Sequence, residues 1–153
     1  MKENDTTLTP LWITDKIGPF DLDPCAYPEH LTAKTLNVWP SCGLSIPWHG
    51  AVWCNPPYSN PMPWVRKMAN HGNGIMLILA STDTAWFQEA VKTANAIHFP
   101  KGRLTFHRKD MSPVKLMRAS AFIGWGDAGL RLKKLADGFG WQYPTTPPAS
   151  PTT

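Results

Sequence analysis

One apolar stretch, from Gly74 to Ala80, constrains the fold more than any other part of the chain. No polar side chain interrupts it, which predicts a strand buried on both faces. Apolar residues repeat at helical spacing on either side, within 64–69 and within 87–94. Further strands are predicted at 20–23, 51–54, 96–99, 102–106 and 120–125. We therefore expect an α/β domain in which helices flank a mostly parallel sheet.

Local signals set the expected boundaries of these elements. Pro61 and Pro63 suit the first turn of a helix that ends at Gly72, and residues 81–84 offer several caps for the next helix. The strand at 20–23 is expected to end at Pro24. The spacing of apolar residues in 132–139 predicts a short last helix. A single domain is expected over 1–143, followed by a disordered Pro/Thr-rich tail over 144–153.

The tetrad Asn55-Pro56-Pro57-Tyr58 lies between a predicted strand and a predicted helix. Such a tetrad is typical of enzymes that methylate an amino group conjugated to a ring or a carbonyl. The Asn55 oxygen and the Pro56 carbonyl can accept hydrogen bonds from that amine, and Tyr58 offers a flat face for stacking. An ordinary proline turn is the alternative. The position at the carboxyl end of a strand favours a functional site, because open α/β sheets bind ligands there.

The charge of the chain is unevenly distributed. Six of its 11 acidic residues lie in the first 29 positions, whereas residues 101–118 hold six basic residues and one acid, Asp110. The basic residues are Lys101, Arg103, Arg108, Lys109, Lys115 and Arg118. We interpret this cluster as a phosphate-binding surface for nucleic acid, with a solvated loop as the alternative.

Other classes of protein are excluded by what the sequence lacks. It has no apolar run long enough to cross a membrane, and residues 1–5 do not resemble a signal peptide, so we expect a cytoplasmic protein. Its cysteines (Cys25, Cys42 and Cys54) and its histidines lack the spacing of metal ligands, so no metal site is predicted.

A second motif, Phe20-Asp21-Leu22-Asp23-Pro24-Cys25-Ala26, precedes the tetrad by 30 residues. Together with Thr9-Pro10, Trp53–Tyr58, Thr82–Phe87 and Gly102–Phe106, it resembles the phage-type DNA N6-adenine methyltransferase (Dam-like) family. The matched blocks follow the order of the family. In one place the chain departs from it, because Ser41-Cys42-Gly43 stands where such sequences commonly carry an acid before the glycine.

The resemblance implies a compact, truncated Rossmann-like sheet that binds S-adenosylmethionine (SAM) and methylates the N6 amine of a flipped adenine, site-specifically, in DNA. It implies that Asn55, Pro56, Pro57 and Tyr58 are catalytic. It further implies that the cofactor is bound by Phe20, Asp21, Asp23, Pro24, Cys25 and Ala26, with an acid facing its ammonium group. Cys42 in place of the acid would then weaken cofactor binding. A phage or prophage origin and a role in protecting DNA from restriction are also implied.

Several alternatives remain open at this point. The same tetrad serves enzymes that methylate RNA or protein glutamine, and a relative that binds nucleic acid without turnover has the same sequence pattern. We expect no separate domain that reads the target sequence. Base reading would fall to residues 101–119, which implies low sequence specificity or a homodimer.

Overall fold

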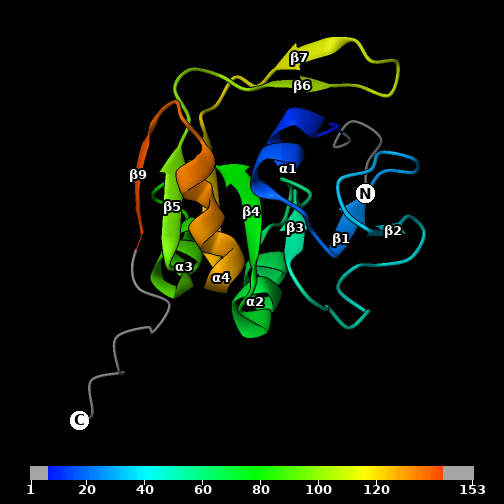
Figure 1. The fold of residues 1–153 in the computed structure, drawn as a ribbon, viewed down its shortest axis with the longest axis horizontal. Coiled ribbons are helices and arrows are strands. Elements are labelled where there is room, and N and C mark those ends of the chain that lie inside the picture. Colours follow the sequence, from blue (N-terminus) through cyan, green and yellow to red (C-terminus); the bar gives the residue numbers. More distant parts are fainter. Residues whose placement is uncertain (1–6, 143–153) are drawn as a thin grey trace.

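The computed structural model describes residues 7–142, so the tail predicted for 144–153 lies outside the described residues. Its strands are β1 (Leu22–Ala26), β2 (Thr35–Val38), β3 (Val52–Cys54), β4 (Gly74–Leu79), β5 (Ala96–Phe99), β6 (Thr105–His107), β7 (Pro113–Lys115), β8 (Ser120–Trp125) and β9 (Phe139–Gln142). Seven of them form one sheet in the order β2-β1-β3-β4-β8-β5-β9, and β6 and β7 form a separate hairpin (Figure 1).

One half of the sheet is parallel and the other half is antiparallel. From β2 to β4, all neighbouring strands pair in parallel. Strand β8 inserts antiparallel between β4 and β5, and β9 pairs antiparallel with the outer edge of β5. The α/β class is confirmed. The prediction of a mostly parallel sheet is correct for the half from β2 to β4. It is wrong for the other half, where β8 runs in the opposite direction to both of its neighbours, β4 and β5.

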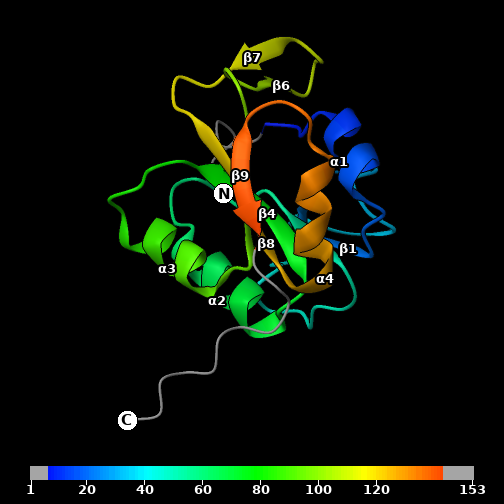
Figure 2. The ribbon, with the colours of Figure 1, turned by 60° about the vertical axis from the view of Figure 1, so that its left-hand side comes forward.

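Helices cover both faces of the sheet. They are α1 (Leu11–Ile17), α2 (Met62–His71), α3 (Ala85–Thr93) and α4 (Gly126–Gly129), which continues into the 3-10 helix η2 (Leu130–Lys134). Figure 2 shows α2 and α3 on one side of the sheet and α1 and α4 on the other. The domain therefore has three layers, with a core on each side of the sheet.

Strand β4 contributes to both cores, as its unbroken apolar sequence predicts. Met76 and Ile78 pack in the cluster that includes residues of α2 and α3. Ile75 and Leu77 point the other way, into the cluster that includes residues of α1 and η2. All four side chains are fully buried. Successive residues of a strand face opposite sides of the sheet, so a strand covered on both sides needs apolar residues throughout.

The predicted ends of the two central helices are confirmed. Helix α2 ends at Gly72, whose φ of 78° lies in the left-handed region that favours glycine. Helix α3 is capped by Thr84, whose side-chain oxygen accepts a hydrogen bond from the Phe87 amide. These boundaries depend on neighbouring residues alone, which is why the sequence predicts them.

Two other boundaries differ from prediction. Strand β1 continues through Pro24 to Ala26, with an irregular register between Asp23 and Ala26 where proline has no amide to donate. The last helix begins earlier than predicted and ends before Phe139. Phe139 belongs instead to β9, where its ring packs 5.3 Å from that of Phe99. Pairing with β5 overrides the helical spacing of the apolar residues in 132–139.

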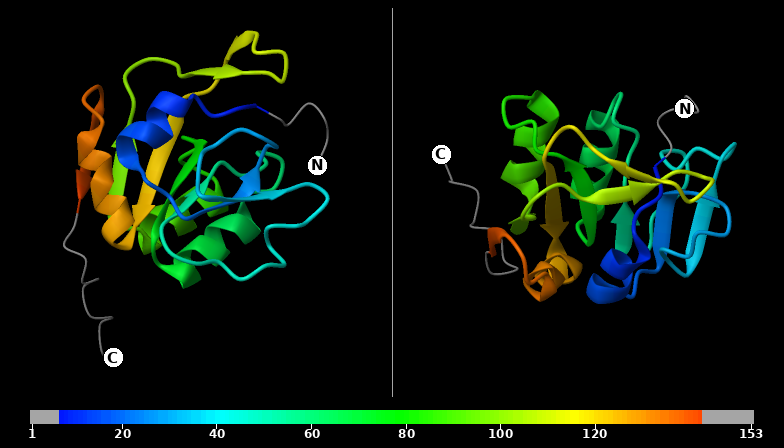
Figure 3. Two further views of the ribbon diagram at one scale, coloured as in Figure 1. Left: turned by 45° about the vertical axis from the view of Figure 1, so that its right-hand side comes forward. Right: turned by 90° about the horizontal axis from the view of Figure 1, so that it is seen from above.

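The hairpin of β6 and β7 lies beyond the carboxyl ends of β4 and β5 (Figures 1 and 3). The predicted strand over 102–106 is thus shorter than expected, and the segment predicted as a basic loop contains β7. An isolated antiparallel bridge joins Leu8 to His107 of β6. Among the helices of residues 7–142, none combines the length and apolarity that a membrane crossing requires.

Candidate active site

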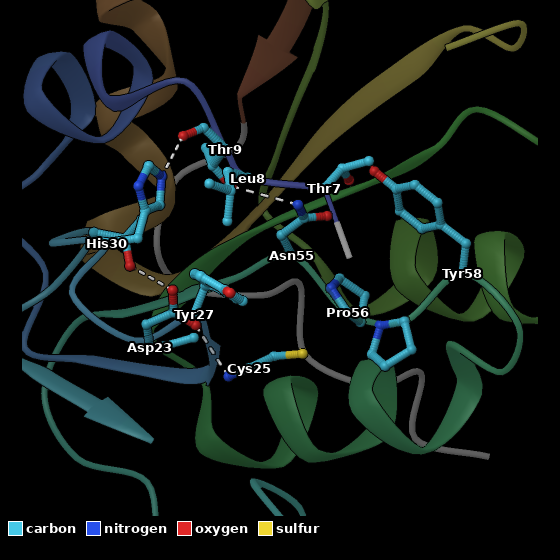
Figure 4. Close-up of a pocket in the computed structure, with 13 residues that line it drawn as sticks. Thr7, Leu8, Thr9, Asp23, Cys25, Tyr27, His30, Asn55, Pro56 and Tyr58 are labelled. Atoms are coloured by element: carbon cyan, nitrogen blue, oxygen red, sulfur yellow. Dashed lines mark hydrogen bonds between the residues drawn. The ribbon is translucent and has the colours of Figure 1, made fainter. Parts of the chain in front are cut away.

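The tetrad Asn55–Tyr58 directly follows β3 and forms one wall of a pocket (Figure 4). The opposite walls come from β1, from the loop after it, and from the segment before α1. The pocket is lined by Thr7, Leu8, Thr9, Asp23, Cys25, Ala26, Tyr27, His30, Thr32, Asn55, Pro56, Pro57 and Tyr58. Because β1 and β3 are parallel neighbours, their carboxyl ends meet at one edge of the sheet. The pairing therefore brings the two motifs together.

Asn55 presents an acceptor with no partner in the structure. Its side-chain nitrogen donates to the Thr9 hydroxyl oxygen at 3.4 Å. Its side-chain oxygen is buried and, among the described residues, accepts no hydrogen bond. Figure 4 shows the amide nitrogen turned toward Thr9. A buried polar atom without a partner costs free energy, so its presence in a pocket indicates a ligand that donates to it.

Tyr58 adds a ring and a second unpartnered polar atom to the same pocket. Its hydroxyl is buried and has no hydrogen-bond partner among the described residues. Burial raises the pKa of Tyr58 above its ordinary value, so the hydroxyl is neutral at physiological pH. The pocket thus keeps a neutral aromatic ring beside the Asn55 acceptor, on the opposite side from His30 (Figure 4).

Asp23 brings a buried carboxylate to the floor of the pocket. Only 3% of the residue is exposed, and its two oxygens accept from the Thr32 hydroxyl and from the Cys25 amide. Burial outweighs these hydrogen bonds and raises the pKa of Asp23 to about 6. A carboxylate has about four lone-pair positions, so Asp23 keeps acceptor capacity for a cationic ligand.

A second hollow adjoins the first. Cys25, Ala26 and Pro57 line both of them. The second hollow, with a volume of about 260 Å³, extends past Pro24 to Trp39, Cys42, Gly43, Leu44 and Trp64. Burial and, to a lesser extent, the Asp23 charge raise the pKa of the Cys25 thiol to about 12. Cys25 therefore lines both hollows as an uncharged thiol. The two hollows together form an elongated site between β1 and the tetrad.

The loop that carries Cys42 is held against β1. A Cβ at Gly43 would lie 2.0 Å from the Pro24 carbonyl oxygen, so only glycine fits this close approach. On the other side, the Lys67 ammonium group of α2 donates to the carbonyls of Leu44 at 2.8 Å and Ile46 at 2.5 Å. Cys42 itself is exposed at the rim of the second hollow. The position at which the family resemblance implies an acid thus faces this hollow.

Two residues predicted to bind the cofactor lie outside both hollows. Phe20 is buried in the core, with its ring 5.6 Å from that of Trp53. The Asp21 carboxylate accepts a hydrogen bond from the Ala51 amide at 2.8 Å and lies 3.6 Å from Lys34. This backbone hydrogen bond is the main reason that the pKa of Asp21 is lowered. Both residues support β1 and its connection to β3.

The six predicted DNA-binding residues are all exposed, but they do not form one compact group. They lie on the loop before β6, at the hairpin turn, on β7 and on the loop before β8. Lys101 and Arg103 line a separate hollow with Trp12 and Lys16. Lys109 lies next to the pocket, because its ammonium group is 5.6 Å from the centre of the ring of Tyr27, which lines it.

Six residues that line the pocket were not among the predicted site residues: Thr7, Leu8, Thr9, Tyr27, His30 and Thr32. His30 donates from Nε2 to the Thr9 carbonyl oxygen at 2.6 Å, since a carbonyl can only accept. Thr32 bonds to Asp23. Of these residues, only Thr9 carried a signal in the sequence, the Thr9-Pro10 block shared with the family that the chain resembles.

Known proteins resemble this chain in sequence. The sequence model of the DNA N-6-adenine-methyltransferase (Dam) family matches residues 2–120. A DNA N-6-adenine-methyltransferase of Haemophilus phage HP1 is 29% identical over 116 residues, a match that covers 68% of this chain and 67% of that protein. A protein of the same name from Escherichia phage T1 is 34% identical over 100 residues, which covers 61% of this chain but 42% of that protein. No solved structure matches the chain.

Proposed function

Because this chain belongs to the DNA N-6-adenine-methyltransferase (Dam) family, we propose that it transfers a methyl group from SAM to the N6 amine of adenine in DNA. We assign the reaction to the pocket between β1 and the tetrad. We also assign the sheet as a truncated form of the Rossmann-like methyltransferase sheet. The shared direction of β1 to β4, with the pocket at their carboxyl ends, supports this assignment.

The buried Asn55 oxygen, which has no hydrogen-bond partner in the described part of the chain, is the observation that carries the proposal. The lone pair of the adenine N6 nitrogen is delocalised into the ring, which makes the nitrogen a weak nucleophile. An acceptor on its N–H draws the nitrogen toward tetrahedral geometry and stabilises the positive charge that develops on it. A fixed acceptor achieves this without reorganising during the reaction.

The rest of the tetrad completes this arrangement. The Pro56 carbonyl is the second acceptor for the amine, and the two prolines restrict its position by fixing φ. The Tyr58 ring stacks against the base, which offsets part of the cost of unstacking it from DNA. No residue has to act as a strong base, because the amine loses its proton readily once it is methylated.

The residues of the two hollows fit SAM by their chemistry. Asp23 offers a buried carboxylate with remaining acceptor capacity to the ammonium group, and Pro24, Cys25 and Ala26 form the adjoining wall. Trp39 and Leu44 give the second hollow the apolar surface that suits a nucleoside. SAM supplies an activated methyl group when it is bound. Cys42 has no carboxylate to offer in this hollow, so we expect weaker SAM binding than an acid would allow.

The size of the first hollow bears on how adenine enters. Its volume is about 40 Å³, room for only a few water molecules. Adenine must leave the DNA stack to reach it. Lys109, whose ammonium group lies over the Tyr27 ring, would hold a DNA phosphate beside the pocket, and the other basic residues would hold phosphates farther along the DNA.

The biological setting follows from the relatives. Both named relatives are encoded by phages. We propose that this chain likewise modifies phage DNA in the cytoplasm of a bacterial host and thereby protects it from restriction.

Incubation with SAM labelled on its methyl group tests the proposed function. The protein is supplied separately with unmethylated duplex DNA, RNA and a protein mixture, and the products are hydrolysed and identified by mass. We expect label in N6-methyladenine from DNA. Label in RNA, in protein glutamine or in cytosine would show that the proposed substrate is wrong. If no label were transferred to any of these or to adenine, the enzymatic activity would be refuted.

A further inference from the structure

The segment Thr7–Pro10 connects the hairpin to the pocket. The Leu8 amide donates to the His107 carbonyl at 2.7 Å, and the His107 amide donates back to the Leu8 carbonyl at 3.2 Å. The next residue, Thr9, is 4% exposed and lines the pocket beside Asn55. One short segment therefore contacts β6 through its backbone and the tetrad through a side chain.

Both oxygens of Thr9 are used at the pocket. Its hydroxyl oxygen accepts from the Asn55 side-chain nitrogen at 3.4 Å, and its carbonyl accepts from His30 Nε2 at 2.6 Å. His30 fixes the backbone of Thr9, and Thr9 in turn contacts one end of the Asn55 amide. The other end of that amide is the buried oxygen, which accepts no hydrogen bond from residues 7–142.

The two ends of an asparagine amide have nearly the same shape but opposite chemistry. One end donates two hydrogen bonds, and the other only accepts. The N6 amine of adenine needs an acceptor, so Asn55 must turn its oxygen toward the base. In that orientation its nitrogen points to Thr9 and needs an acceptor there. Without the Thr9 hydroxyl, the productive orientation would leave a buried N–H unpaired.

We propose that Thr9 is a positioning residue that holds the Asn55 amide with its oxygen toward the substrate. The inference rests on the proposed function, because the Asn55 oxygen is assigned there to the adenine amine. It also has a mechanical consequence. Leu8 is paired with β6, so the segment that orients Asn55 is attached to the hairpin whose basic residues are proposed to hold DNA.

The contact itself is tested without DNA or SAM. The side-chain amide of Asn55 is followed by NMR in ¹⁵N-labelled protein and identified by its absence in Asn55→Ala. We expect Thr9→Val to shift or broaden these signals, since valine keeps the shape of threonine and lacks the hydroxyl. Thr9→Ser should leave them close to their wild-type positions. Unchanged signals in Thr9→Val would overturn the proposal.

A matched control separates this contact from a general effect of the substitution. Thr14 is also 4% exposed, but its hydroxyl bonds within α1 to the Leu11 carbonyl at 3.3 Å. Thr14→Val should therefore leave the Asn55 signals unchanged. Thermal unfolding of each variant shows whether the fold is retained.

The effect on catalysis is measured in a double-mutant cycle. We expect Thr9→Val to lower kcat about 10- to 100-fold, with little change in KM for DNA, and Thr9→Ser to restore most of the loss. In the Asn55→Ala background Thr9→Val should cause no further loss, because there is no amide left to orient. Additive losses would overturn the proposal. Altered Asn55 signals in a protein that methylates no adenine would instead refute the proposed function while the contact stands.

Discussion

The pocket and the hairpin of β6 and β7 shift the pKa of an aspartate side chain in opposite directions. Burial in the pocket raises the pKa of Asp23 to about 6. On the hairpin, hydrogen bonds from the Ser112 side chain and backbone lower the pKa of the exposed Asp110. Burial in the pocket disfavours the ionised form of its groups, whereas the hairpin presents charged groups in water. Fixed acceptors are more effective when buried, whereas cations attract DNA from a distance only when exposed.

The largest effect is expected at the centre of the pocket. Asn55→Ala removes an acceptor that faces the developing charge, so turnover should fall about 100-fold or more, comparable with the loss of an oxyanion-hole donor. SAM binding, measured by calorimetry, should change little. Asn70→Ala removes an exposed asparagine from α2 and serves as the control. Near-normal methylation by Asn55→Ala would exclude the tetrad from the mechanism.

The second prediction concerns the free energy of unfolding and its dependence on pH. The folded protein binds a proton at Asp23 more tightly than the unfolded chain, whose aspartate pKa is near 3.8. The stabilisation is therefore fully present below pH 3.8 and is lost as the pH rises through about 6. Asp23→Asn removes this dependence. Relative to wild type, the free energy of unfolding of Asp23→Asn should rise by about 2 kcal/mol between pH 4 and pH 8.

Chemical denaturation of both proteins across this pH range measures the difference. Comparing the two proteins cancels the titration of all other groups. A constant difference would mean that Asp23 is ionised normally, and the contrast between the pocket and the hairpin would disappear.

The third prediction concerns SAM binding. Asp23→Ala removes the carboxylate proposed to face the ammonium group and should weaken binding about 10- to 100-fold, as expected for a lost charge-assisted hydrogen bond. In the wild type, affinity should fall as the pH decreases below about 6, where Asp23 is protonated. Asp21→Ala is the matched control, because Asp21 lies outside both hollows. Equal losses in both variants would place the cofactor elsewhere.

The smallest effect is expected on the hairpin side. Neutralising Arg103, Arg108 and Lys109 together should weaken DNA binding about 10-fold at low salt and similarly for all sequences. It should also reduce the slope of log affinity against log salt by about 0.9 for each lost phosphate contact. Titrations at several salt concentrations measure both.

Replacing Lys92, Lys133 and Lys134 of α3 and η2 changes the net charge equally and should have less effect. Equal effects of the two triple variants would mean that the hairpin residues attract DNA only through the net charge of the protein and do not contact its phosphates. A loss confined to one target sequence would indicate base reading instead.

The sequence by itself determined much of the local structure. The two-faced burial of β4, the helix end at Gly72 and the position of the tetrad after β3 all follow from neighbouring residues. These features depend on side-chain period, on backbone φ and on chain order, which a sequence displays directly. The identity of the tetrad likewise pointed to the chemistry before any geometry was known.

Only the tertiary structure decided how distant segments meet. Thr9 and Asn55 are 46 residues apart, yet their contact orients the acceptor in the pocket. The same holds for β8, which inserts between β4 and β5, and for β9, whose pairing with β5 replaced the predicted helix around Phe139. Phe20 and Asp21 share a motif with Asp23 but lie outside the hollows. Such contacts depend on burial and on pairing between distant segments, which no local sequence pattern encodes. The arrangement of the site residues therefore follows from the tertiary structure.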